Sequence, residues 1–175
     1  MLLKTAIPGC HLRPWRGDDK PALVRHANNA NVWRNLGEIF PHPYTEADAD
    51  TWLAFAAQPK TGIHFAIEFQ GEAVGGIGAT PREGIGCQTG HFGYWLGETQ
   101  WGKGIATAAA RATVAHVFLE TNLARLEAPV IAWNPASMRV LEKVGFVREG
   151  VLRRSVFKDG QLTDSVIYAL LRESV

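Results

Sequence analysis

The stretch GYWLGETQWGKGIATAAARATV, residues 93–114, decides how this chain is organised. Its first residues fit the end of a strand, and the alanine-rich segment after Gly104 fits a helix. Between them, Gly102 and Gly104 let the backbone bend and let a ligand approach its N–H groups. A helix that starts directly after such a loop points its free N–H groups and the positive end of its dipole at one spot. The stretch therefore predicts an anion site suited to a pyrophosphate, with Lys103 and Thr107 beside it.

Two well-known phosphate-binding loops do not fit this stretch. A Walker A loop requires Ser or Thr after its lysine, but Gly104 follows Lys103. A dinucleotide fingerprint requires a third glycine where Thr107 stands, and it belongs in the first βαβ unit of a fold. Taken alone, Gly102 and Gly104 are also compatible with a tight turn that binds nothing.

Periodicity and turn residues divide the rest of the chain. Strands are expected over residues 11–15, 64–70, 73–80, 91–98, 125–133, 151–157 and 163–171. A first helix is expected to be capped by Asp18 or Asp19 and to end in the region of Asn28–Asn29. Further helices are expected over 45–58, with Thr45 and Asp48 as capping box, over 105–120, and from Pro135 to Gly145. Gly93 and Gly97 suggest a bulge or a close backbone approach. This order predicts one α/β (α+β) domain over residues 1–175.

A second informative stretch is WNPASMRVLEKVGFVREGVLRR, residues 133–154. Asn134 fits an N-cap with Pro135 at the first helical position, and Gly145 fits the residue that ends the helix. By itself this stretch is explained as a capped helix followed by a strand, with Ser137 a polar residue of the first turn.

Together the two stretches resemble the GNAT superfamily of N-acetyltransferases, nearest to its RimJ/RimL-type branch. The loop pattern [Q/R]-x-x-G-x-[G/A] is met at Gly104 and Ala106, with Trp101 where Gln or Arg is usual. The branch pattern N-x-x-S-x-x-x-L-x-K-x-G-F is met by Asn134, Ser137, Leu141, Lys143, Gly145 and Phe146. The segment FPHPYTEADADTWL resembles the second helix of the branch and the loop before it, and the resemblance extends over residues 11–171.

The resemblance implies a single GNAT-like domain with a mixed, mostly antiparallel sheet, two splayed central strands and flanking helices. It implies transfer of the acetyl group of acetyl-CoA to a primary amine, on a protein N-terminus or a small molecule, by direct attack in a ternary complex. A backbone N–H near Leu96 would polarise the carbonyl, Asn134 would hold the pantetheine arm, and Ser137 would donate a proton to the thiolate. The implied coenzyme A contacts are Trp95, Leu96, Trp101, Gly102, Lys103, Gly104, Ile105, Ala106, Thr107, Asn134, Ser137 and Lys143.

The general base does not carry over from the branch, because its Glu aligns with about Val156. The remaining candidates are Glu38, His42, Glu98 and Asp164, each of which also fits a solvated or capping residue. Glu38 is preferred because it is the carboxylate of the irregular segment 33–44. The missing Glu also leaves open a catalytically weak or inactive coenzyme A-binding module.

The acceptor is expected at the irregular segment 35–44, which two prolines keep out of regular structure. The aromatic residues that flank it, Trp33, Phe40 and Tyr44, could line an acceptor cleft, although core packing explains each of them as well.

Composition bounds the remaining possibilities. Apolar residues make up 46% and charged residues 20%, with a net charge of +1, so there is no general case for nucleic-acid or membrane binding. Cys10 and Cys87 form no CxxC, and the histidines have no metal-like spacing, so no metal is expected. The beginning of the chain does not read as a signal peptide, and a cytoplasmic protein is expected. Dimers are common in the branch, so a homodimer is among the expected states.

Overall fold

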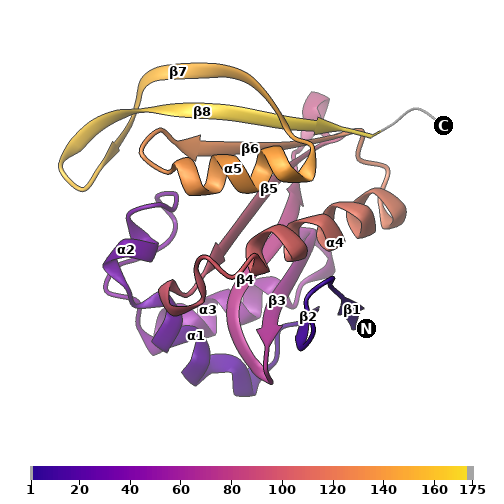
Figure 1. Cartoon of the computed structure of the whole chain (residues 1–175), viewed down its shortest axis with the longest axis vertical. Helices are drawn as coiled ribbons and strands as arrows, with labels where there is room; N and C mark the ends of the chain where they lie inside the picture. The colour runs from indigo at the N-terminus through magenta and orange to yellow at the C-terminus, as the bar shows by residue number, and fades with distance from the viewer. Residues whose placement is uncertain (1, 173–175) are drawn as a thin grey trace.

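An eight-stranded sheet runs through the molecule in the order β1-β2-β3-β4-β5-β6-β8-β7 (Figure 1). The computed structural model describes residues 2–172. The strands are β1 Leu3–Lys4, β2 Cys10–Pro14, β3 Ile63–Phe69, β4 Glu72–Pro81, β5 Thr89–Leu96, β6 Arg125–Ile131, β7 Val147–Lys158 and β8 Gln161–Leu171. The helices within these residues are α1 Lys20–Ala27, α2 Ala30–Trp33, α3 Glu46–Ala56, α4 Ile105–Glu120 and α5 Pro135–Val144.

The centre of the sheet is splayed. All neighbouring strands are antiparallel except β5 and β6. These two are parallel and pair only where Thr89–His91 of β5 lies beside Arg125–Glu127 of β6. Beyond that point β5 continues along β4, whereas β6 continues along β8. The two strands therefore separate toward their carboxyl ends, as the predicted fold class requires, and this mixed α/β domain has a mostly antiparallel sheet.

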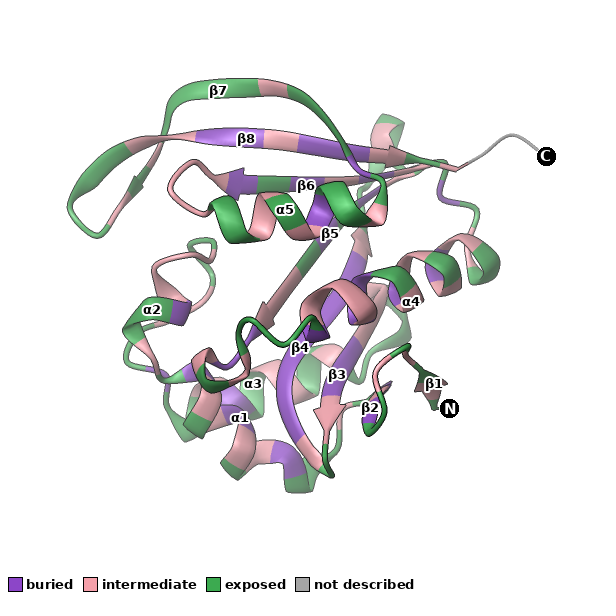
Figure 2. Cartoon of the chain, viewed as in Figure 1, coloured by how far each residue is buried: buried purple, intermediate pink, exposed green. Residues whose placement is uncertain are grey.

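Helices cover both faces of the sheet, and each face has its own hydrophobic cluster (Figure 2). The larger cluster lies under α4 and α5 and includes Phe92, Leu126 and Leu141. The alanines of α4 allow that helix to approach the sheet closely, and Ala109 and Ala110 are fully buried. The smaller cluster joins α1 and α3 to the other face through Leu23 and Ala49.

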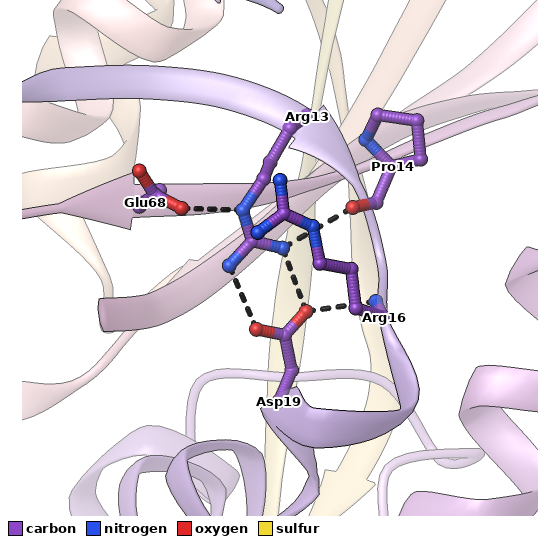
Figure 3. A network of polar contacts seen from close by, with 5 residues as sticks. All are labelled: Arg13, Pro14, Arg16, Asp19 and Glu68. Carbon is purple, nitrogen blue, oxygen red and sulfur yellow. Dashed lines mark hydrogen bonds and ion pairs between the residues drawn. The ribbon is translucent and has the colours of Figure 1, made fainter. Parts of the chain in front are cut away.

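A buried ion-pair network joins β2, β3 and the turn before α1 (Figure 3). Arg13 donates to both carboxylate oxygens of Asp19 at 2.7 Å and also to Glu68. Asp19 therefore does not cap α1 through its side chain, and that expectation was wrong. Its carboxylate accepts hydrogen bonds from Arg13 and from the backbone N–H of Arg16 instead.

Most local signals produced the expected elements. Thr45 and Asp48 form the capping box of α3, α4 has the predicted bounds, and Gly145 ends α5 in the left-handed conformation. The structure adds β1 and α2, and β7 begins four residues before the expected strand, at Val147. The pairing of β4 with β5 is regular at Gly93, so no bulge forms there. Gly97 is needed because a Cβ atom would collide with the ring of His26.

Candidate active site

The glycine loop lies between β5 and α4, as the sequence indicates. Gly102 and Gly104 have φ values of 76° and 77°, which an L side chain rarely adopts. Gly104 is the N-cap of α4, and no side chain caps that helix end. The first N–H groups of α4 therefore lack a side-chain partner from the cap residue, which is the arrangement that binds anions at helix N-termini.

A hollow of about 580 Å³ lies beside this helix end. It is lined by Gly104, Thr107 and their neighbours on α4, by residues 4–7, and by Lys143 of α5. Lys4 and Arg111 also line it, so three cationic side chains surround the hollow. Arg111 donates to the backbone carbonyl of Lys143 at 2.8 Å, which ties α4 to the end of α5. Lys103 donates to Gln100 at 2.8 Å and is held within the loop. This charge distribution suits a polyanion such as a diphosphate.

The end of β5 presents backbone groups to the splayed side of the sheet. Gly97 N–H donates to Val74 at 2.8 Å, on the β4 side. Because successive residues of a strand alternate in direction, the N–H and C=O of Leu96 point away from β4, toward the gap. The carbonyl of Leu96 accepts a hydrogen bond from the indole N–H of Trp101 at 2.8 Å. Trp101 thus closes the glycine loop onto β5, while the N–H of Leu96 faces the gap.

Across the gap, the first turn of α5 carries two of the predicted residues. The Asn134 side chain accepts a hydrogen bond from the N–H of Ser137 at 3.1 Å and so serves as N-cap of α5. The hydroxyl of Ser137 lies 2.8 Å from the hydroxyl of Tyr94, on β5. The Tyr94 hydroxyl also lies 3.1 Å from the backbone carbonyl oxygen of Ser137, which can accept its proton. Burial raises the pKa of Tyr94 to about 12, against a smaller lowering by the Ser137 hydrogen bond.

The chain matches the family model described as the acetyltransferase (GNAT) domain over residues 10–147. It belongs to the GNAT acetyltransferases. Its relatives include the ribosomal-protein-serine acetyltransferase of Escherichia coli, 31% identical over 63% of this chain and 61% of that protein. A solved structure, Mycobacterium smegmatis RimJ in complex with CoA-disulfide, is 28% identical to this chain, with a TM-score of 0.83. The match covers 98% of this chain and 86% of the RimJ chain. These similarities place the chain in the RimJ/RimL-type branch.

A shorter match reaches higher identity. The probable N-acetyltransferase YjcK of Bacillus subtilis is 45% identical over 84 residues, which are 48% of this chain and 46% of that protein. The match therefore spans less than half of YjcK.

In this GNAT domain, two of the predicted acceptor residues, Phe40 and Tyr44, pack with α1 and α3, whereas Trp33 ends α2. Trp33 stacks with His42 at a centroid distance of 5.3 Å, and Phe40 contacts Tyr44 at 5.2 Å. Tyr44 is buried in the smaller hydrophobic cluster, and burial raises its pKa to about 12. The side chain of Trp95 packs against the same cluster, with Phe40 at 5.6 Å. Trp95 therefore presents only its backbone to the face that carries α4.

The candidate bases differ in their surroundings. Glu98 accepts hydrogen bonds from the side-chain amides of Asn29 and Asn31, at 2.7 and 2.8 Å, and so anchors α2. Asp164 accepts from the backbone N–H of Arg154 at 2.7 Å, within the β7–β8 hairpin. Glu38 is exposed in the loop after α2 and lies near Lys158 at the tip of that hairpin. Glu98 and Asp164 thus already have structural partners.

Several residues of this region carry roles that the sequence alone does not indicate. The sequence places Tyr94 only within a strand, although an aromatic hydroxyl in a half-buried strand is a signal for a hydrogen-bonding role. Lys4 and Arg111 belong to no motif. Within residues 2–172, no group of three or more His, Cys, Asp or Glu side chains could hold a metal ion. No helix of the same residues has the length and hydrophobicity needed to span a membrane.

Proposed function

We propose that this protein transfers the acetyl group of acetyl-CoA to a primary amine by direct attack in a ternary complex. The observation that carries the proposal is the pairing of two features across the splayed strands. One is the glycine loop at the N-terminus of α4 with its surrounding cations. The other is the Asn134–Ser137 turn of α5, hydrogen-bonded to Tyr94 on β5. We take residues 1–175 as the catalytic domain.

Each part has a role in this scheme. The diphosphate of coenzyme A would lie over Gly102–Thr107, where helix N–H groups, Lys4, Arg111 and Lys143 offset its charge. The thioester supplies the activated acyl group. The N–H of Leu96, which faces the gap, would stabilise the oxygen that becomes negative during attack. Asn134 would hold the pantetheine arm, and Ser137 would donate a hydrogen bond to the departing sulfur. A thiol with a pKa of about 8.5 leaves readily, so this help is modest.

We further propose that the acceptor is the N-terminal amine of a protein and that the reaction takes place in the cytoplasm. The support is that a relative is named for acetylating a ribosomal protein. Two exposed apolar residues, next in sequence to Glu38 and Lys158, agree with a protein partner: Ile39 is 97% and Phe157 74% exposed. A small-molecule amine is the alternative.

Two measurements test the proposal. Purified protein is incubated with acetyl-CoA and a panel of N-terminal peptides and small amines, and release of free thiol is followed with mass detection of the acetylated product. In parallel, calorimetry measures coenzyme A binding to the parent and to Gly104→Val. We expect strongly weakened binding in this variant, because the added side chain stands where phosphate must meet backbone.

Gly84→Val is the matched control. Gly84 also has a positive φ, of 64°, and the place that a Cβ atom would take there has no neighbour within 4 Å, but this glycine lies in the loop between β4 and β5. It shares the backbone strain without the proposed phosphate contact. Equal coenzyme A affinity in folded Gly104→Val and parent would sink the assignment of the loop. Coenzyme A binding without acetylation of any amine would favour the inactive binding module.

A further inference from the structure

Arg34 joins the two sides of the candidate acceptor region. It follows directly on α2, and its guanidinium carbon lies 4.7 Å from the ring centroid of Trp133. Trp133 lies between β6 and α5 and immediately precedes Asn134, the N-cap that holds the amide of Ser137. The stacking therefore brings a cation to within one residue of the turn where we place the chemistry.

The guanidinium of Arg34 still has hydrogen-bonding capacity. Its Nε atom is buried and makes no hydrogen bond within residues 2–172. Arg34 forms an ion pair with Asp159, but the carboxylate oxygen lies 3.7 Å from Nε, which is longer than a hydrogen bond. The side chain is 43% exposed, so part of the guanidinium faces solvent. Buried donors without a partner are uncommon in folded proteins, and each one calls for a ligand or a water molecule.

Trp133 adds a second donor of the same kind. Its indole N–H is buried and has no hydrogen-bond partner in the described part of the chain. Indole and guanidinium groups only donate hydrogen bonds. Two neighbouring groups that can only donate are complementary to oxygen atoms, and a guanidinium fork fits a carboxylate best.

A second cation, Lys158, lies in this region and is also held against an aromatic ring. Lys158 lies over the ring of Trp33, with Nζ at 4.1 Å from the centroid. Burial lowers the pKa of Lys158, while Glu38 and Asp159 pull it in the opposite direction. Arg34 and Lys158 are half-buried against aromatic rings, whereas Glu38 and Asp159 are exposed. Both cations are thus held against aromatic rings, with the two carboxylates close to them.

We propose that Arg34, held against Trp133, selects acceptors that carry a carboxylate close to the reacting amine. The class is a polypeptide N-terminus with Asp or Glu at its second or third residue. The carboxylate would pair with Arg34, which leaves the amine free to reach the turn at Asn134 and Ser137. This inference rests on the proposed acetyl transfer to an amine and adds the charge of the acceptor.

Binding of matched peptides tests the inference without turnover. Calorimetry on the protein saturated with coenzyme A compares two hexapeptides that begin Ser-Glu and Ser-Gln and are otherwise identical. We expect the Ser-Glu peptide to bind about tenfold more tightly, as for a hydrogen bond to a charged group. Equal affinities for the two peptides would overturn the inference.

Substitutions then assign the discrimination to Arg34. Arg34→Met keeps an unbranched stem on Trp133 and removes the charge, so it should bind both peptides as the parent binds Ser-Gln. Arg34→Lys keeps the charge without the fork and should retain only part of the preference. The control is Arg139→Met, on the exposed side of α5, which should discriminate as the parent does. Undiminished preference in folded Arg34→Met would assign the role to another cation and overturn the proposal.

Two further arms separate the possible sources of failure. Free glutamate against glutamine tests for a small acceptor: discrimination confined to the free amino acids overturns the polypeptide assignment. Replacing coenzyme A by acetyl-CoA then reports turnover. Selective binding of Ser-Glu without any acetyl transfer would contradict the proposed function while supporting the role of Arg34 in binding.

Discussion

The hydroxyl of Tyr94 on β5 lies 2.8 Å from the hydroxyl of Ser137 on α5 and bridges the splayed part of the sheet. Two proton arrangements are compatible with this contact. If Tyr94 donates to the Ser137 carbonyl, which only accepts, then the Ser137 hydroxyl donates to Tyr94. If Tyr94 donates to the Ser137 hydroxyl, the Ser137 proton is free for another acceptor. Only the second arrangement lets Ser137 assist the departing sulfur, so Tyr94 controls which group Ser137 can serve.

The first prediction concerns this pair. Ser137→Ala should lower kcat with little change in the KM for acetyl-CoA, because the hydrogen bond forms fully only as the sulfur becomes negative. Tyr94→Phe should lower kcat about fivefold, because a hydrogen bond between uncharged groups contributes about 1 kcal/mol. The double variant should be no slower than Ser137→Ala alone, since Tyr94 acts through Ser137.

Tyr168→Phe is the matched control for this pair. Tyr168 is a buried tyrosine whose hydroxyl donates to Glu142 of α5 at 2.7 Å, so its loss also removes a hydrogen bond to that helix. It should leave kcat at the parent value. A parent rate in Ser137→Ala would reduce Ser137 to a residue of the first helical turn.

The second prediction concerns pH. Because burial raises the pKa of Tyr94 to about 12, its phenol stays protonated below that pH, and its hydrogen bond persists through the whole assay range. The kcat profiles of parent and Tyr94→Phe should therefore run parallel between about pH 6 and 10, with the variant uniformly lower. A fall in the parent kcat below about pH 10 that is absent from Tyr94→Phe would contradict this, because it would mean that Tyr94 ionises in that range.

Signals that act within a few residues can be read from the sequence. The helix α4 begins after a glycine in the left-handed conformation, and α5 begins at an Asn–Pro pair and ends at Gly145. Each of these boundaries depends on the conformation of one or two residues. These local signals do not show that the glycine loop and the Asn134–Ser137 turn bind one ligand. That expectation comes from the resemblance of the two stretches to the GNAT superfamily.

The helix α2 shows where local patterns fail. The sequence predicts Asn28 and Asn29 as the end of α1, but the Asn29 side chain accepts hydrogen bonds from the N–H groups of Asn31 and Val32. Asn29 therefore starts a new helix of four residues, which is too short to show a periodic pattern. Glu98, distant in the chain, stabilises it through both asparagine amides.

Contacts across the sheet are also beyond the sequence. Tyr94 meets Ser137, and Arg34 meets Trp133, only after the strands are ordered and the helices are placed on them. No local pattern distinguishes these side chains from ordinary core or surface residues. Asp19 is an example of a local signal that a distant contact overrides. Its position fits a helix cap, but its carboxylate accepts hydrogen bonds from Arg13 instead.

The third prediction concerns stability. Arg13 and Asp19 are 3% and 6% exposed, so Arg13→Met would leave a buried carboxylate without its partner. Removing one member of a buried pair costs about 3–5 kcal/mol of unfolding free energy, measurable by urea titration. The control is Lys20→Met, which breaks the exposed pair with Asp50 and should change stability far less. Equal losses of unfolding free energy in the two variants would mean that the ion-pair network in Figure 3 contributes little to stability.

The fourth prediction concerns the size of the acceptor. Ile39 and Phe157 are exposed apolar residues next in sequence to Glu38 and Lys158, which lie near each other in the acceptor region. Ile39→Ser and Phe157→Ser should raise the KM for a protein acceptor and leave that for a short peptide unchanged, since only a larger partner covers both. Leu119→Ser, an exposed apolar residue near the end of α4, is the control. Unchanged KM values for the protein acceptor in both variants would show that Ile39 and Phe157 do not contact it.

The last prediction concerns Glu38 as the base. It is exposed at the acceptor region, so it could take a proton from the incoming amine directly or through a water molecule. Glu38→Gln keeps the shape and removes the charge, and it should depress acetylation while coenzyme A affinity stays intact. The loss should be largest near neutral pH, where an α-amine of pKa about 8 is mostly protonated, and should fade as pH rises above that value.

The neighbourhood of Glu38 sharpens the comparison. Glu38 also pulls up the pKa of Lys158, so its removal lowers that pKa further and makes the acceptor region less positive at high pH. The rate loss caused by a less positive Lys158 would grow as pH rises, whereas the rate loss caused by the missing base would become smaller. The ratio of the Glu38→Gln rate to the parent rate, followed against pH, therefore separates the two effects. Glu83→Gln, an exposed carboxylate in the loop before β5, is the control for a change in net charge. If Glu38→Gln acetylates at the parent rate at every pH, the proton leaves to another residue or to solvent.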